Sequence, residues 1–168
     1  RPWFSDLDNI IIMFIRVVLI SLNNTLRGFS MDRLAHKLCG CSNIKHKLAA
    51  FIIKGGTIRA TGYNKRSFHG STHAEIDAIR KMRFQKGGSQ GCDLYVYRFY
   101  ADGGYALAKP CVPCMKKIIN AGIKRVFYSD YDNKMRMINI NGVDLNSYTY
   151  GVIDISKSSA TLGEGILG

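Results

Sequence analysis

Short apolar runs separated by turn-forming residues dominate the pattern of this 168-residue chain from residue 31 onward. Such runs are typical of β-strands, and unbroken ones are typical of strands that are buried on both faces. Lys54, Gly55 and Gly56 follow the first run and predict a hairpin turn into the second. The predicted strands are residues 47–53, 57–63, 93–100, 124–129 and 135–140.

Apolar residues at helical spacing predict three helices. The first covers residues 31–38, with Ser30 as its N-cap. A loop is expected to lead from the second strand into the second helix, which begins near His73. The third helix follows Pro110, a residue that suits the first helical position, and ends near Gly122. The apolar faces of the last two helices carry Ile76, Ile79, Met82, Met115, Ile118 and Ile119.

Glu75 stands out because the chain contains only two glutamates, Glu75 and Glu164. One interpretation is structural: Thr72 and Glu75 have the spacing of a capping box, in which each side chain bonds a backbone N–H of the other residue. The other interpretation is chemical, since His73 lies two residues before Glu75. The local sequence leaves both open.

Cys111 and Cys114 lie in the predicted first turn of the third helix, where the helix dipole favours a thiolate. This spacing is found in redox motifs and in structural zinc sites. No second pair of this spacing exists to complete a four-cysteine site, and a redox motif gives His73 and Glu75 no role.

Taken together, H-A-E at 73–75 and P-C-x-x-C at 110–114 resemble the signature of the zinc-dependent nucleoside, nucleotide and nucleic-acid deaminases. The resemblance implies that His73, Cys111 and Cys114 bind one zinc ion and leave its fourth position to water. It also implies that Glu75, which is no ligand, moves protons while water replaces the exocyclic amine. A second, structural zinc on Cys39, Cys41, His46, His69 or Cys92 is not expected.

The resemblance covers residues 31–140, and the sequence that flanks the two motifs is most similar to deoxycytidylate-type deaminases. The implied fold is α/β, a three-layer α/β/α domain with a mixed five-stranded sheet. Family resemblance places Asn64, Ala74, Lys109 and Pro110 at the substrate, with Asn64 against the sugar; the alternative for Asn64 is a plain turn residue. Lys109 departs from the small polar or acidic residue usual at its position and would bring positive charge to the pocket rim.

A second departure concerns the last strand. Deoxycytidylate and tRNA adenosine deaminases place a helix before their fifth strand, which is then parallel to its neighbour. Here only residues 130–134 separate the two apolar runs. A segment of this length allows a hairpin but no crossover, so the fifth strand is predicted to be antiparallel.

The net charge is +12, of which +11 lies in residues 31–168. This excess favours a phosphorylated or polyanionic partner. A free cytidine or deoxycytidine nucleotide is the first substrate hypothesis, and single-stranded DNA or RNA is the second, favoured by aromatic residues beside basic ones. A catalytically silent zinc module is the third, and the presence of Glu75 argues against it. A homo-oligomer is also expected.

The rest of the chain sets limits on class and location. Five cysteines, an odd number, argue for a reducing compartment such as the cytoplasm rather than a disulfide framework. The apolar run at 10–22 contains Arg16 and is shorter than the roughly 20 residues a membrane span needs, so no membrane association is expected. The predicted organisation is an accessory segment of unknown role (1–30), a deaminase domain (31–155) and a glycine- and serine-rich tail (156–168).

Overall fold

The computed structural model describes residues 31–149. The predicted accessory segment (1–30), the Ser30 cap and the predicted tail (156–168) lie outside the described residues. The described helices and strands are residues 31–40 (helix), β1 (Leu48–Lys54), β2 (Thr57–Tyr63), β3 (Lys65–Ser67), β4 (Gly70–Thr72), α2 (Ala74–Met82), β5 (Asp93–Arg98), α3 (Val112–Asn120), β6 (Arg125–Ser129), β7 (Met135–Asn139) and the 3-10 turn η1 (Ile140–Gly142).

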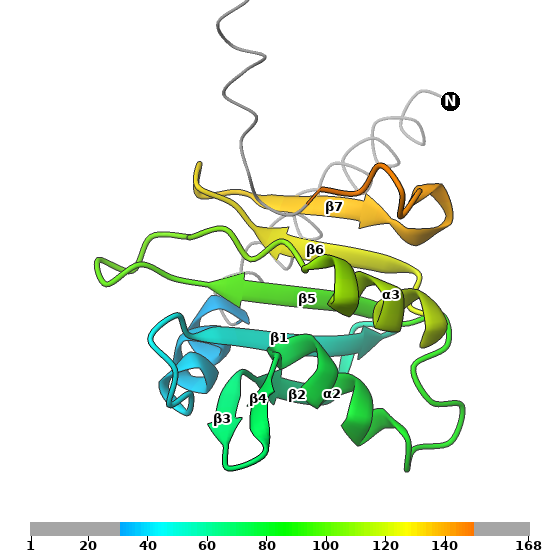
Figure 1. Ribbon diagram of the computed structural model, residues 1–168, viewed down its shortest axis with the longest axis horizontal. Helices are drawn as coiled ribbons and strands as arrows, with labels where there is room; N and C mark the ends of the chain where they lie inside the picture. The colour runs from blue at the N-terminus through cyan, green and yellow to red at the C-terminus, as the bar shows by residue number, and fades with distance from the viewer. Residues whose placement is uncertain (1–30, 150–168) are drawn as a thin grey trace, which may run out of the picture.

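A mixed five-stranded sheet in the order β2-β1-β5-β6-β7 forms the middle layer. Only the β5–β6 pair is parallel, and α3 lies on the connection between these two strands. Helices α2 and α3 cover one face of the sheet, and the helix at residues 31–40 lies at the other (Figure 1). This is the predicted three-layer arrangement.

Strand β1 shows how the sequence produces two cores. Successive side chains of a strand point to opposite faces. Ala50 and Ile52 therefore pack into the larger core under α2 and α3, whereas Ala49 and Phe51 pack into the smaller core with the helix at residues 31–40. An apolar run without alternation is what a strand covered on both faces requires.

The antiparallel fifth strand is confirmed. Strands β6 and β7 pair from Arg125 with Asn139 to Ser129 with Met135. Asn133 takes the left-handed conformation that such a turn needs, with φ 58°, and the N–H of Asp130 donates to the carbonyl of Lys134. Residues 130–134 are thus a hairpin.

Two local predictions were wrong. The expected loop before α2 is a second hairpin, β3–β4, in which Lys65 pairs with Thr72. Proline 110 is not the first helical residue, because Cys111 is the N-cap of α3 and Pro113 occupies the first turn. The third helix does end as expected: Gly122 follows the C-cap with φ +70°.

Gly62 on β2 allows the sheet to lie unusually close to α2. A Cβ atom at this position would lie 2.5 Å from the backbone nitrogen of Ala78 and closer still to the carbonyl oxygen of Ala74. Neither atom can move unless the helix moves. The absence of a side chain at Gly62 therefore sets the height of α2, and of His73 at its start, above the sheet.

We expect Gly62→Ala to lower the free energy of unfolding by roughly 3 kcal/mol or more, since it forces a rigid helix away from a packed strand. Denaturant unfolding measures this change. Gly40→Ala is the matched control, because a Cβ there meets nothing within 4 Å. Equal stability of the two variants would contradict the close approach.

Candidate functional site

The N-terminal ends of α2 and α3 bring the two sequence motifs together. His73 is the N-cap of α2, Cys111 is the N-cap of α3, and Cys114 lies in the first turn of α3. The Nδ1 atom of His73 is 3.6 Å from Sγ of Cys111 and 3.3 Å from Sγ of Cys114. Within residues 31–149, this is the only group of three histidine, cysteine or acidic side chains with ligand atoms close enough to hold a metal ion.

These distances match a zinc site. Zinc lies about 2.3 Å from thiolate sulfur and about 2.0 Å from imidazole nitrogen, so tetrahedral angles place the sulfur and nitrogen ligands about 3.5 Å apart. The observed separations of 3.3 and 3.6 Å bracket that value. One nitrogen and two sulfurs are a donor set that zinc prefers, and three protein ligands are typical of a catalytic zinc ion with one open position. Burial raises the pKa of Cys114, with Glu75 and Cys111 adding to the shift, so metal binding must displace a proton.

Glu75 is buried beside these ligands, with 2% of its surface exposed. One carboxylate oxygen, Oε2, is enclosed and has no hydrogen-bond partner among residues 31–149. Burial raises the pKa of Glu75 above its usual value. A capping box would direct this carboxylate to the backbone at Thr72, but the N-cap is His73 and no side chain caps the helix. The capping-box interpretation is therefore wrong.

Glu75 lines a cavity of about 210 Å³ together with His73 and Cys111. Of the predicted substrate residues, Asn64, Ala74 and Lys109 line this cavity, whereas Pro110 does not. The β3–β4 hairpin and the segment before β1 also contribute to the cavity, although neither belongs to the deaminase motifs. The remaining lining residues are Ile44, His46, Leu48, Arg66 and Ser71.

Asn64 is more than a turn residue. Its Oδ1 accepts hydrogen bonds from the N–H of Leu48 and the hydroxyl of Ser42, both 2.8 Å long. Its Nδ2 donates to the carbonyl of His46 at 2.6 Å. The surrounding donors and acceptor fix the orientation of the amide, and one Nδ2 hydrogen remains for a further partner. Asn64 thus ties the end of β2 to the segment before β1 at the cavity wall.

The cavity rim is basic. Arg66 and Lys109 line it, and Nδ1 of His46 lies 2.8 Å from the guanidinium of Arg98. Apart from Glu75, no acidic residue of the described part of the chain lines this cavity. The rim therefore suits an anionic group on the ligand.

Two other cavities are less suitable. One of about 210 Å³ touches the ligands from the side of α3 and contains no carboxylate. Another, of about 540 Å³, lies between the far parts of α2 and α3 and is not lined by the ligands or by Glu75. The candidates for a second zinc are dispersed: Cys39 and Cys92 are buried in different cores, and Cys41 is exposed.

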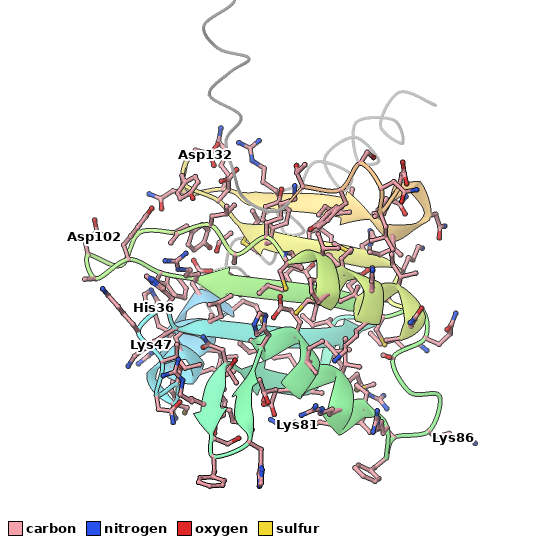
Figure 2. The ribbon with its side chains drawn as sticks, viewed as in Figure 1. His36, Lys47, Lys81, Lys86, Asp102 and Asp132 are labelled. Carbon is pink, nitrogen blue, oxygen red and sulfur yellow. The ribbon has the colours of Figure 1, made fainter. Side chains whose placement is uncertain are left out.

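Asp77 anchors the β3–β4 hairpin to α2, and Lys81 projects from the same helix (Figure 2). The carboxylate of Asp77 lies 2.8 Å from the ammonium group of Lys65 and 3.0 Å from that of Lys81. Burial alone would raise the pKa of Asp77, but these hydrogen bonds and charges lower it overall. The paired carboxylate consequently contributes stability above its unfolded pKa of about 4.

We expect Asp77→Asn to lower the free energy of unfolding by about 1 kcal/mol at pH 7, a modest value because both lysines are partly exposed. Since the folded pKa is depressed, the difference from the unchanged protein should shrink as the pH falls below about 4 and the carboxylate takes up a proton. Unfolding curves at pH 7 and at acidic pH measure both values. A difference that grows at acidic pH would contradict the ion pairs.

Comparisons with known proteins agree with this site. Residues 29–130 match the family model described as the cytidine and deoxycytidylate deaminase zinc-binding region. The dCMP deaminase from cyanophage S-TIM5, solved with dCMP and dUMP, is 26% identical; the match covers 60% of this chain and 79% of that chain, with a TM-score of 0.49. The cytidine deaminase from Burkholderia pseudomallei is 16% identical over 67% of this chain and 92% of that chain, with a TM-score of 0.53. No curated protein matches the chain.

The Burkholderia structure confirms the predicted cytidine-deaminase-like fold. In the described part of the chain, no helix has the length and hydropathy to cross a membrane. His73, Cys111 and Cys114 are the zinc-binding site, since they occupy the family's zinc-binding region with the ligand geometry described above. The matched region spans more than half of the sequence, and the chain belongs to the zinc-dependent cytidine and deoxycytidylate deaminase family.

Proposed function

We propose that this protein hydrolytically deaminates cytosine to uracil in a free cytidine or deoxycytidine nucleotide, with Glu75 as its catalytic residue. The observation that carries the proposal is the buried carboxylate of Glu75, which has an unpartnered oxygen beside the zinc ligands and borders the cavity. A buried acidic group without a partner costs stability, and its retention beside a metal site favours a role in proton transfer.

The chemistry follows from the positions of these groups. A zinc ion held by His73, Cys111 and Cys114 supplies Lewis acidity that makes water a nucleophile at neutral pH. Glu75 accepts the first proton of the attacking water and delivers it to the ring nitrogen of cytosine. It then accepts the remaining proton of the added hydroxyl and delivers it to the amino group, which leaves as ammonia while the carbonyl of uracil forms. Its raised pKa suits this exchange, because an efficient general acid and base has a pKa near the working pH.

The cavity wall suggests how a nucleotide is held. We assign the remaining Nδ2 hydrogen of Asn64 to the sugar and the backbone of Ala74 to the base. A phosphate would meet the positive charge of Arg66 and Lys109 at the rim. The volume of about 210 Å³ is below the roughly 300–1,000 Å³ of sites for drug-sized ligands, which favours a small substrate.

Single-stranded nucleic acid is the second candidate because of one exposed aromatic residue. Phe68 is 99% exposed at the tip of the β3–β4 hairpin, and this hairpin borders the cavity through Arg66 and Ser71. An exposed aromatic ring beside basic residues can stack on an unpaired base. The predicted homo-oligomer and reducing compartment remain predictions of the sequence.

Turnover of dCMP, CMP, cytidine and a cytosine-containing oligonucleotide separates the candidates. We expect turnover of a free nucleotide and no measurable oligonucleotide binding at low salt. Binding through several phosphates would instead weaken steeply with salt, with a log–log slope of about −0.7 for each phosphate neutralised. Conversion of cytosine within the oligonucleotide, with free nucleotides ignored, would establish the second candidate. Zinc binding without turnover of any substrate would establish a silent module.

A further inference from the structure

Tyr148 reaches the zinc centre from the C-terminal end of the described chain. After β7 and η1, the chain turns at residues 144–147 and brings this residue back toward the start of α3. Its hydroxyl donates a hydrogen bond of 2.8 Å to the carbonyl of Pro110. Its ring lies 4.8 Å from the ammonium group of Lys109 and packs against the larger core. One side chain therefore contacts both residues that precede Cys111.

The hydrogen bond acts on the peptide unit that carries the first cysteine ligand. The carbonyl of Pro110 and the N–H of Cys111 belong to one planar peptide group, so holding the carbonyl also holds the plane from which Cys111 projects. Pro110 precedes α3, in which the carbonyl of Cys111 is the first to accept a helical bond, from Met115. The helix itself consequently leaves this peptide unconstrained, and Tyr148 provides the constraint.

The ring acts on Lys109. A cation over the face of an aromatic ring is attracted by the ring's negative face, and the contact also limits the freedom of a long side chain. Lys109 lines the cavity that contains Glu75. Tyr148 thus holds a positive charge at the rim of that cavity.

We propose that Tyr148 is a positioning residue for the zinc centre: its hydroxyl orients the peptide that carries Cys111, and its ring holds Lys109 at the rim for an anionic substrate group. The second part rests on the proposed nucleotide substrate, whereas the first depends only on the zinc ligands. Burial raises the pKa of Tyr148, so its hydroxyl keeps its proton and can donate this hydrogen bond.

Tyr148→Phe isolates the hydrogen bond, since it keeps the ring over Lys109. We expect this variant to lose zinc to a competing chelator about five- to tenfold faster than the unchanged protein does. This factor corresponds to the loss of one hydrogen bond. The visible spectrum of the cobalt-substituted protein should shift as the ligand geometry changes. With nucleotide, kcat should fall by a similar factor while KM stays within about twofold.

Tyr148→Leu additionally removes the ring. We expect KM for the nucleotide to rise about fivefold beyond that of Tyr148→Phe, with no such rise for the uncharged nucleoside. Lys109→Met should reproduce this loss of discrimination without accelerating zinc release. The two contacts of Tyr148 can thus be measured separately.

Tyr128→Phe is the matched control, because Tyr128 on β6 packs against the same core. It should release zinc at the rate of the unchanged protein. If Tyr148→Phe also releases zinc at that rate with an unchanged cobalt spectrum, the positioning role is overturned. Zinc release needs no substrate, so this result stands even if the protein deaminates no cytosine compound, an outcome that would overturn the proposed function alone.

Discussion

Glu75→Gln should reduce deamination by on the order of 10³-fold while the protein remains folded and retains its zinc. The amide has nearly the same shape as the carboxylate but cannot accept and return a proton at neutral pH, and the proposed reaction uses that transfer in more than one step. Stability should not fall, since Oε2 of Glu75 makes no hydrogen bond that the substitution would break. Single-turnover rates measure the deamination, a zinc assay measures the metal content, and a thermal unfolding curve measures the stability.

Asp77→Asn is the matched control for this result. Asp77 is a second buried carboxylate on the same helix, but its oxygens bind Lys65 and Lys81 rather than face the cavity. We expect it to retain activity within about tenfold despite its lower stability. If Glu75→Gln retains activity to the same degree, Glu75 has no catalytic role.

The double substitution Cys111→Ala and Cys114→Ala should abolish zinc binding and activity together. Only His73 would remain of the three ligands, and a single imidazole does not retain zinc against a chelator. The melting temperature should fall as well. Zinc binds the folded protein, in which it links the starts of α2 and α3, and a ligand that binds only the folded state stabilises that state. Metal analysis after purification without added zinc, followed by thermal unfolding, measures both effects.

Cys92→Ala serves as the control for the loss of a buried thiol. Cys92 is fully buried in the larger core and is not a ligand, so its removal should lower stability while zinc binding persists. Full zinc retention by the double variant would contradict the ligand assignment. Loss of zinc from Cys92→Ala would show that unfolding, rather than ligand removal, accounts for the result.

The sequence alone determined those features that depend on neighbours along the chain. The apolar run of β1 predicted a strand buried on both faces, and the shortness of residues 130–134 predicted an antiparallel β7, since no crossover fits that length. The family motif identified His73, Cys111 and Cys114, because each motif occupies a few consecutive residues at a helix start.

Other local features were ambiguous because two structures satisfy the same pattern. Thr72 and Glu75 have capping-box spacing, yet the helix begins one residue later than a Thr72 cap requires, and Glu75 is a buried residue that lines the cavity. Pro110 suits a first helical position, but α3 begins at Val112, and Pro113 is its second residue. The start of the helix differs from the expected one by one residue in α2 and by two residues in α3, a shift that the local pattern does not determine.

Only the tertiary structure decided which distant residues complete the site. Arg66 and His46 lie outside the two deaminase motifs and reach the cavity through the β3–β4 hairpin and the segment before β1. Tyr148 meets Pro110 only after the chain has passed through α3, β6 and β7. Gly62 matters because α2 lies directly against it. These contacts join residues far apart in the chain, so no local pattern encodes them, and the packing of helices on the sheet brings them together.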